Sequence, residues 1–367
     1  MQHLIVRGRN SLNATSLTAL MAQLSMQRPL LVCSQRMQTD FVAKTGMVLP
    51  IFSGYHANPD LADAIAGVDI YRANGCDGLI SVGGGSAMDT AKAVKSLLLA
   101  GSMEIAMTNR LPEGKLPHIA IPGTAGTGAE ATPIGVVYVN NDKISLDHPQ
   151  LLPEGMILDS ALLDTLPLYH KKACAMDALC QGIESYWSAA ATAESRRHAE
   201  RAILGVLKNM DAYLAGDTAA ADAVLDAAYE SGCAIRISRT TAPHAMSYQI
   251  TKRIGPAHGH ACMLTLPHLW RRLEGTPVLA ELNALMGTED GASLLLGMLA
   301  ATDMLPDAQP DDDMLDALAA SVNVQRLGNH PEKLTTEQLR AVYAQAFAPM
   351  TQDEQARLAA LWRNYGE

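Results

Sequence analysis

The sequence predicts two domains, an α/β domain with a parallel sheet over residues 1–165 and an all-α domain over residues 166–367. Three observations support this fold class. The 367 residues exceed the roughly 250–300 residues at which a single hydrophobic core stops growing. The first half of the chain alternates short apolar runs with helical spacing, which is typical of βαβ units. After Pro167 the pattern changes to long stretches rich in Ala, Leu and Met.

The first domain is expected to contain strands that alternate with helices. The expected strands are Met1–Asn10, Pro29–Cys33, Asp77–Val82 and His118–Pro122, and the expected helices are Leu61–Asn74 and Ala87–Ala100. Ligands of such sheets bind beyond the carboxyl ends of the strands. The turns that follow these apolar runs are therefore the places where a ligand site is expected.

The second domain is expected to be helical because Ala, Leu and Met are strong helix formers. Three clear helical patterns are Ser195–Leu214, Ala219–Ile237 and Thr336–Phe347. The Pro- and Asp-rich stretch Asp303–Asp313 is expected to be a surface loop. Aromatic residues make up only 4% of the chain, which argues against a β-sandwich.

Charge and hydropathy exclude several classes of protein. The net charge is −10 and the basic residues are scattered, so we expect no nucleic-acid partner and no membrane-surface patch. No apolar run reaches the ~18–20 residues of a membrane span, and the first ten residues lack the apolar core of a signal peptide. These features predict a cytoplasmic protein.

The six cysteines lack CxxC pairs and regular spacing, which argues against a zinc ribbon or a disulfide framework. They are Cys33, Cys76, Cys174, Cys180, Cys233 and Cys262. We expect them to be buried, reduced thiols.

A glycine-rich loop follows the expected strand Asp77–Val82. It reads Gly83-Gly84-Gly85-Ser86 and leads into an expected helix. Glycines let backbone N–H groups approach an anion closely, and the helix N-terminus adds unpaired donors and a positive dipole end. A plain turn needs about one glycine, so three in a row favour a diphosphate ligand. The motif leaves the nucleotide unspecified.

A second loop with small residues follows the expected strand His118–Pro122. It offers two hydroxyl groups, those of Thr124 and Thr127. Such a loop is suited to a ribose, a phosphate or a nicotinamide, and by itself it is equally consistent with a flexible turn.

Candidate metal ligands lie in the second domain. Asp177 and Gln181 are four residues apart and share one face of a helix, and His244, His258 and His260 come later. One carboxylate and two imidazoles suit Fe(II) or Zn(II). The spacing alone does not separate such a site from ordinary structural histidines.

Taken together, these segments resemble the iron-containing alcohol dehydrogenase family. The matching motifs are GGGSAMDTAK, PGTAGTGAE, MDALCQGIESYWS, APHAMSY and PAHGHA, in the family's order, over about residues 54–269. The resemblance implies the dehydroquinate synthase-like fold, with a Rossmann-like dinucleotide-binding domain, a helical domain and an active site in the cleft between them. It also implies a metal-dependent oxidoreductase that interconverts aldehydes and alcohols with NAD(P)H.

The resemblance assigns cofactor-binding roles in the first domain. The pyrophosphate loop corresponds to Gly83–Ser86, and further cofactor residues correspond to Asp89, Thr124, Thr127 and Lys143.

It assigns the metal to Asp177, His244 and His258. Most family members have a histidine where this chain has Gln181, whose amide oxygen is a weaker donor. We keep Gln181 as the expected fourth ligand and leave Fe²⁺ and Zn²⁺ open. Many members also have a histidine at the position of Tyr248, so the proton donor is open among water, the ribose hydroxyl, His260 and Tyr248.

The residues after the strand Pro29–Cys33 bear on the choice of nicotinamide. An acidic residue there would bind the ribose 2′-hydroxyl and repel a 2′-phosphate. This chain has Ser34 at that place and Arg36 nearby, which predicts a preference for NADP(H) over NAD(H).

The motifs look most like the subgroup that reduces phosphonoacetaldehyde to 2-hydroxyethylphosphonate. A phosphonate needs cations or N–H donors near the metal. Arg239, Lys252, Arg253 and His260 are candidates, although ordinary solvated charges explain them equally well.

The expected mechanism uses the metal as a Lewis acid on the carbonyl oxygen while the nicotinamide delivers hydride, with Asp177, His244, His258 and His260 as catalytic residues. The alternatives are a generalist alcohol or diol dehydrogenase, a synthase of the dehydroquinate synthase type and a metal-free binding protein. The expected partner is a small aldehyde or alcohol, and the family's frequent dimers make a homodimer possible.

Overall fold

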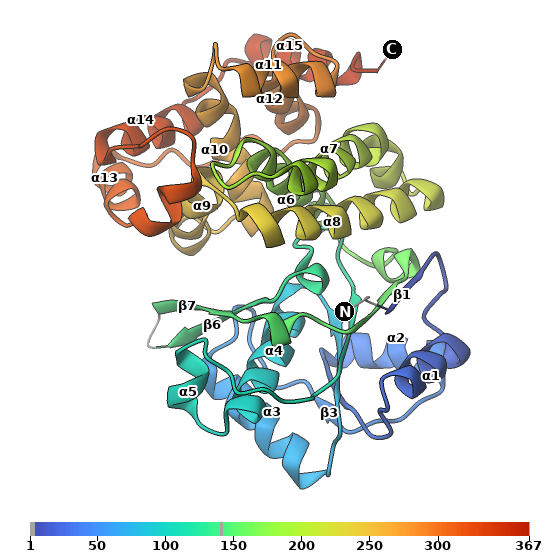
Figure 1. The fold of residues 1–367 in the computed structure, drawn as a ribbon. Helices are drawn as coiled ribbons and strands as arrows, with labels where there is room; N and C mark the ends of the chain where they lie inside the picture. Colours follow the sequence, from blue (N-terminus) through green and yellow to red (C-terminus); the bar gives the residue numbers. More distant parts are fainter. Residues whose placement is uncertain (1–3, 140–141, 367) are drawn as a thin grey trace. The chain divides into compact units, whose positions relative to one another are not determined.

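The chain divides into two compact units (Figure 1). The computed structural model describes residues 4–139 and 142–366, without the side chains of residues 324–326. Unit 1 ends at Leu166 and unit 2 begins at Pro167. Unit 1 is α/β and the described part of unit 2 is helical, so the predicted fold class is confirmed. The assignment of cofactor binding to the first domain and catalysis to the second stays a prediction.

A six-stranded parallel sheet forms the centre of unit 1, in the order β1-β8-β5-β4-β2-β3. The strands are β1 (Leu4–Arg7), β2 (Leu30–Cys33), β3 (Ile51–Phe52), β4 (Leu79–Gly83), β5 (His118–Pro122) and β8 (Gly155–Leu158). All four expected strands are present, although residues 1–3 of the first lie outside the described residues. The two strands of this sheet that were not predicted, β3 and β8, have only two and four residues.

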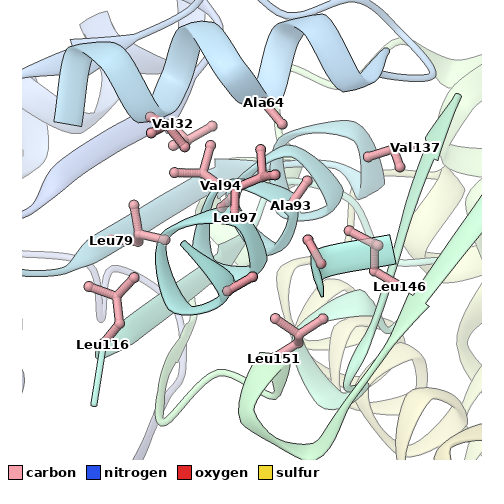
Figure 2. Packing of buried hydrophobic residues seen from close by; sticks show 14 of the residues in the cluster. Val32, Ala64, Leu79, Ala93, Val94, Leu97, Leu116, Val137, Leu146 and Leu151 are labelled. Atoms are coloured by element: carbon pink, nitrogen blue, oxygen red, sulfur yellow. The ribbon is translucent and has the colours of Figure 1, made fainter. Parts of the chain in front are cut away.

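Alternate side chains of the strands point to opposite faces, and helices cover both faces. Leu30 and Val32 of β2 pack with α3 and α4, whereas Leu31 and Cys33 pack with α1 and α2. The helices are α1 (Ala14–Gln23), α2 (Gln35–Thr45), α3 (Leu61–Ala73), α4 (Gly85–Ala100) and α5 (Met103–Met107). Figure 2 shows the cluster on the α3 and α4 face, where Val94 and Leu97 lie near Val32 and Leu79.

The course of the chain reverses between the neighbouring strands β2 and β4. The helix after β2 packs on one face of the sheet and the helix after β4 packs on the other. Such a reversal opens a crevice at the carboxyl ends of the two strands, where α/β sheets bind their ligands. The fold therefore creates a ligand position at the glycine-rich loop that the sequence singled out.

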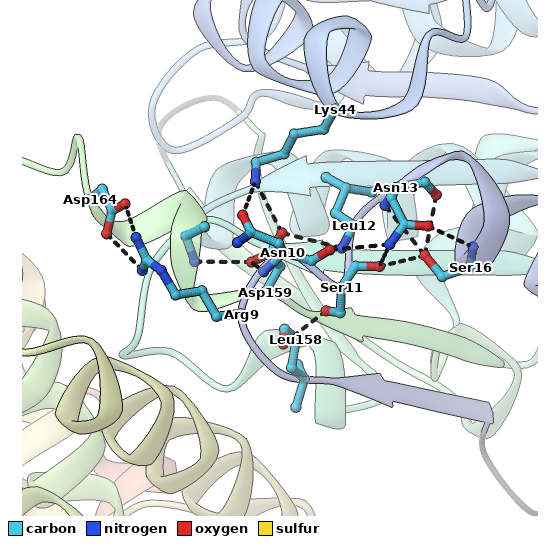
Figure 3. Close-up of polar contacts among 11 residues, drawn as sticks. Arg9, Asn10, Ser11, Leu12, Asn13, Ser16, Lys44, Leu158, Asp159 and Asp164 are labelled. Atoms are coloured by element: carbon cyan, nitrogen blue, oxygen red, sulfur yellow. Dashed lines mark hydrogen bonds and ion pairs between the residues drawn. The ribbon is translucent and has the colours of Figure 1, made fainter.

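Asp159 fixes the turn that follows β1, as Figure 3 shows. Its carboxylate is fully buried and accepts hydrogen bonds from the backbone N–H groups of Asn10 (2.7 Å) and Leu12 (3.2 Å). Lys44 of α2 places its Nζ atom 3.3 Å from the same carboxylate. This buried charge is paired and hydrogen-bonded, so it ties β8, the first turn and α2 together.

An antiparallel hairpin, β6 (Ile134–Val139) and β7 (Asp142–Asp147), was not predicted. Lys92 of α4 anchors it, because its buried Nζ atom donates to the carbonyl oxygens of Ala129 and Ile134, each at 2.7 Å. Burial lowers the pKa of Lys92 to about 8. Gly135 lets the hairpin approach closely, since an added Cβ atom would lie 3.0 Å from Cβ of Lys92.

The described part of unit 2 consists of helices. They are α6 (Leu168–Trp187), α7 (Ala193–Leu214), α8 (Thr218–Ser238), α9 (Ala242–Arg253), α10 (His258–Arg272), α11 (Pro277–Met286), α12 (Gly291–Ala301), α13 (Asp312–Ala320), α14 (Thr336–Ala346) and α15 (Gln352–Arg363). The three helices named from the sequence correspond to α7, α8 and α14, and the Pro- and Asp-rich loop is present before α13. Within the described ranges, none of the helices combines the length and apolar character needed to cross a bilayer.

Gly259, at the start of α10, allows α10 to lie against α6. An added Cβ atom at Gly259 would be 2.1 Å from the carbonyl oxygen of Ala173 and 2.5 Å from Cβ of Asp177. A side chain of any size is therefore excluded unless the helices separate. This close approach brings the residue before it, His258, toward Asp177.

Candidate metal and cofactor sites

Three helices of unit 2 bring four candidate metal ligands together. Asp177 comes from α6, His244 from α9, and His258 and Cys262 from successive turns of α10. One donor atom from each residue lies within 4.8 Å of the donor atoms of the other three. Three of these residues are sequence-predicted ligands, and Cys262 is not.

The distances within this group suit one small cation. Oδ1 of Asp177 lies 3.3 Å from Nε2 of His244 and 3.9 Å from Nε2 of His258. Asp177 Oδ1 and His244 Nε2 are both buried and have no hydrogen-bond partner among the described residues. Buried polar atoms are rarely left in this state. A divalent metal would satisfy both atoms, so the residues fit the metal that the resemblance implied.

Glu184, one turn after Gln181 on α6, orients His244. Its fully buried carboxylate accepts a hydrogen bond from Nδ1 of His244 through Oε1. Its Oε2 accepts from the backbone N–H and the hydroxyl of Thr241, at 2.6 and 3.0 Å. Because His244 carries its proton on Nδ1 and donates it to Glu184, the lone pair of Nε2 faces Asp177, which is the tautomer that binds a metal.

Ser247 and Tyr248 of α9 orient His258. The Ser247 hydroxyl donates to the carbonyl oxygen of His244 and lies 3.1 Å from Nδ1 of His258, from which it accepts. The ring of Tyr248 stacks on that of His258 with an interplanar angle of 6°. These contacts direct Nε2 of His258 toward Asp177. Tyr248 therefore helps to position the ring of His258, and its role as a proton donor stays a prediction.

Asp177 is suited to be an anionic ligand. Burial alone would raise its pKa, but the imidazoles of His258 and His244 outweigh burial and lower the pKa of Asp177 below its usual value. The carboxylate therefore remains ionised across the physiological range.

The side-chain oxygen of Gln181 is directed away from the four candidate metal ligands. Oε1 of Gln181 lies 2.8 Å from the hydroxyl of Ser231 on α8, and the side chain also hydrogen-bonds Asp177. In this orientation the amide nitrogen is directed to Asp177, and the oxygen, the only atom able to bind a metal, contacts Ser231. The structure does not bring the Gln181 oxygen to the cluster, and its role as a ligand stays a prediction.

His260 lies outside the cluster. Its Nε2 donates to the carbonyl oxygen of Met304 (2.6 Å), and its Nδ1 accepts from the hydroxyl of Tyr169 (3.2 Å). Both ring nitrogens are used, and burial lowers the pKa of His260. These contacts tie α10 to neighbouring segments, so a proton relay through His260 would require one of them to break.

The predicted cofactor loops lie at the carboxyl ends of three neighbouring strands of unit 1, β2, β4 and β5. Gly83 has a φ angle of +144°, which favours glycine. An added Cβ atom on Gly84 would lie 3.3 Å from Thr124, and one on Gly85 would lie 3.3 Å from Thr127. The fold therefore brings the two loops into contact at the N-terminus of α4, whose backbone N–H groups are suited to a diphosphate.

The other predicted cofactor residues have individual environments. Ser34 caps α2 and accepts from the backbone N–H of Met37 at 3.3 Å. Arg36 donates to the carbonyl oxygen of Thr165 at 2.6 Å. Ser86 and Asp89 lie in the first turns of α4, and Lys143 lies on β7 opposite Tyr138. The roles of these residues in cofactor binding stay predictions.

Sequence reasoning missed Cys262 and Glu184. Cys262 follows His258 by four residues, the spacing that puts two side chains on one helix face, and Glu184 follows Asp177 by seven. These spacings were visible signals. The structure forms no disulfide among the six cysteines, all within its described part, and five of them are buried while Cys174 is half-buried.

Known proteins match both units. The family described as "iron-containing alcohol dehydrogenase" matches residues 3–160, and that described as "Fe-containing alcohol dehydrogenase family, C-terminal" matches residues 172–347. A phosphonoacetaldehyde reductase of Streptomyces viridochromogenes is 33% identical over 77% of this chain and 80% of its own length. A lactaldehyde reductase of Escherichia coli is 30% identical over 64% of this chain and 63% of its own length.

Solved structures show the same fold. The crystal structure of a sulfoacetaldehyde reductase from Bifidobacterium kashiwanohense in complex with NAD+ has a TM-score of 0.85 at 24% identity and covers 95% of this chain and 98% of its own. Because the two family matches cover most of the sequence, the chain belongs to the iron-containing alcohol dehydrogenase family and is a nicotinamide-dependent oxidoreductase acting on CH–OH groups.

Proposed function

We propose that this enzyme reduces phosphonoacetaldehyde to 2-hydroxyethylphosphonate with NADPH and a divalent metal, Fe²⁺ or Zn²⁺, bound by Asp177, His244 and His258. The observation that carries the metal assignment is the pair of buried atoms without hydrogen-bond partners, Asp177 Oδ1 and His244 Nε2. The substrate assignment is supported by the 33% identical phosphonoacetaldehyde reductase.

The residues of unit 2 would supply a preorganised site. When bound, the metal acts as a Lewis acid that polarises the aldehyde carbonyl toward hydride attack. Asp177 contributes the negative charge, and the two histidines contribute neutral nitrogen donors that Glu184 and Ser247 hold in place. A histidine fixed by such outer partners loses little freedom when the metal binds.

The residues of unit 1 would hold the cofactor. The pyrophosphate would bind at Gly83–Ser86, where the N-terminal N–H groups of α4 serve as donors. No carboxylate follows β2 to repel a 2′-phosphate, because Ser34 stands there. Arg36 would exchange its hydrogen bond to the Thr165 carbonyl for the 2′-phosphate. A lower KM for NADH than for NADPH would count against this choice of cofactor.

Arg239 is the strongest candidate for binding the phosphonate. It is half-buried in the short connection between α8 and α9, two residues before Thr241, whose N–H group binds Glu184. Lys252 and Arg253 are exposed at the other end of α9, and Arg253 donates to Gln249. A charged group close to the histidine-orienting carboxylate is better placed to recognise an anion beside the metal than one on the surface.

The test compares two aldehydes of similar size, phosphonoacetaldehyde and butanal, with metal-loaded enzyme and NADPH. A preference of ~100-fold in kcat/KM corresponds to roughly 2.7 kcal/mol of transition-state binding and would support the phosphonate assignment. Arg239→Ala should reduce this preference, whereas Arg253→Ala is the matched control and should keep it. Equal kcat/KM values for the two aldehydes would instead identify a generalist reductase.

A generalist alcohol or diol dehydrogenase is the second candidate, and the 30% identical lactaldehyde reductase favours it. A substrate panel with short aldehydes and diols decides between the two. A synthase would be recognised because it leaves the nicotinamide unchanged after turnover. Placement in the cytoplasm and a homodimer are further proposals, which fractionation and measurement of the molecular mass in solution would test.

A further inference from the structure

We propose that the thiolate of Cys262 is a ligand of the metal and takes the place that the family resemblance would give to Gln181. The inference rests on the proposed function, because it assumes a metal bound by Asp177, His244 and His258. It changes the expected donor set from nitrogen and oxygen atoms alone to a set that includes sulfur.

The position of Cys262 on α10 places its side chain next to a predicted metal ligand. Cys262 lies one helical turn after His258, so the two side chains leave the helix on the same face. Its Sγ atom is 3.9 Å from Nε2 of His258 and within 4.8 Å of the donor atoms of Asp177 and His244. The fold therefore already places the sulfur beside the three predicted ligands.

The distances fit tetrahedral coordination. Two ligands at about 2.0–2.3 Å from a tetrahedral metal lie about 3.3–3.6 Å apart. The measured separations are 3.3 Å for Asp177 to His244, and 3.9 Å both for Asp177 to His258 and for His258 to Cys262. A contraction of a few tenths of an ångström on binding would satisfy these three pairs, and the other three pairs, each within 4.8 Å, would shorten by up to about 1.3 Å.

The surroundings of Cys262 differ from those of a structural cysteine. Cys262 is fully buried, but its sulfur faces two imidazoles and a carboxylate. Cys33, which is equally buried, packs in the apolar cluster between the sheet and α1. The two atoms without hydrogen-bond partners, on Asp177 and His244, belong to the same group as the sulfur and are an independent sign that a cation belongs there.

The hydrogen bonds of Gln181 favour a role in orienting Asp177 over a role as the fourth ligand. With its oxygen at Ser231 and its amide at Asp177, Gln181 is suited to orient the carboxylate, as a partner in the outer shell does. Binding the metal through Gln181 would require the amide to turn over and to lose its N–H donor to Asp177, while the Ser231 hydroxyl would change from donor to acceptor. Cys262 requires no such change. The resulting set of one carboxylate, two imidazoles and one thiolate favours Zn(II), since thiolates select softer metals than carboxylates do.

Cobalt substitution tests the inference without a turnover assay. The full-length protein is stripped of metal, loaded with one equivalent of Co(II), and its absorption spectrum is recorded. We expect a sulfur-to-cobalt charge-transfer band in the near ultraviolet for the wild type. The band should be lost in Cys262→Ser and kept in Cys233→Ala, a variant of another buried cysteine of unit 2. We also expect Gln181→Leu to retain the band.

Zinc affinity gives a second measurement, by competition with a chromophoric chelator. Cys262→Ser should bind zinc at least about tenfold more weakly than the wild type, because losing even an outer partner of a metal ligand costs 10–100-fold. A wild-type cobalt spectrum without a sulfur band overturns the inference whether or not the variants fold, and a band that is present is assigned to Cys262 by its loss in Cys262→Ser.

The two proposals fail in different ways. If the wild type binds one cobalt ion without a sulfur band, or if the band survives in Cys262→Ser, the ligand assignment of Cys262 is wrong and the metal site itself stands. If the wild type binds no cobalt or zinc, the proposed function is wrong and the role of Cys262 falls with it.

Discussion

The replacement of Glu184 by Gln tests how the protein prepares His244 for a metal. Glu184 offers two acceptor oxygens, one for Nδ1 of His244 and one for the N–H and hydroxyl groups of Thr241. Glutamine has only one acceptor oxygen. If that oxygen stays with the two Thr241 donors, the amide N–H₂ group faces Nδ1, and His244 must place its proton on Nε2, the atom that faces Asp177.

The position of this proton on His244 sets the expected loss of zinc-binding free energy. A buried donor directed at another donor, or a buried acceptor left without a partner, costs about 1–3 kcal/mol. A loss of 1.4–2.7 kcal/mol corresponds to about 10–100-fold, the range found when the outer partner of a metal-binding histidine is removed. We therefore expect Glu184→Gln to weaken zinc binding by about 10–100-fold.

Competition for zinc against a chromophoric chelator measures this change directly. Glu281→Gln is a matched control, because Glu281 is in the same unit but exposed, and its carboxylate lies 2.9 Å from the Arg196 guanidinium. The control should bind zinc as the wild type does. Unchanged zinc affinity in Glu184→Gln, with a normal circular dichroism spectrum, would refute the claim that Glu184 sets the tautomer of His244.

Three further predictions concern the same unit. Gly259→Ala should destabilise the fold by about 1–3 kcal/mol or more, because its methyl group meets the backbone of α6 at Ala173, and denaturant unfolding should show a lower midpoint; an unchanged midpoint contradicts the close contact. His258→Ala should abolish turnover while NADPH still quenches or shifts protein fluorescence as in the wild type, and retained turnover would exclude His258 as a ligand. Burial lowers the pKa of His330 to about 4, so between pH 6.5 and 4 the unfolded chain binds a proton that the folded chain does not. His330 should therefore contribute a fall in stability of up to about 3 kcal/mol as the pH drops through this window, beside that of His268, whose pKa burial also lowers to about 4, and His330→Phe should make the pH slope shallower by this amount; equal pH slopes for the two proteins would contradict it.

The fold class was predictable because local patterns define it. The expected strand Asp77–Val82 is mostly apolar from Leu79 onward, as for a strand buried on both faces, and the glycines after it mark its end. The hairpin of β6 and β7 escaped prediction because it lies outside the strand–helix alternation of the main sheet. Its two strands form a separate sheet, which touches the segment before α3 through a single bridge between Tyr138 and Asp60 and is held in place by Lys92, about forty residues earlier in the chain than Ile134.

The site was predictable only in part, because three helices meet there. Sequence motifs identified Asp177, His244 and His258, whose donor atoms the structure brings together. The direction of the Gln181 amide depends on Ser231, which lies on another helix, and no local pattern reports such a contact. Cys262 was read as an ordinary buried thiol because burial is the usual state of cysteine, and only the fold shows which groups its sulfur faces.

The most direct test of the central claim is a titration of metal-free protein with Zn²⁺ or anaerobic Fe²⁺, in which NADPH oxidation by phosphonoacetaldehyde is followed against the metal bound per chain. The account predicts that metal-free protein is inactive and that the rate rises in proportion to bound metal and saturates at one ion per chain. Full activity of the metal-free protein, or a rate that does not depend on bound metal, would contradict it.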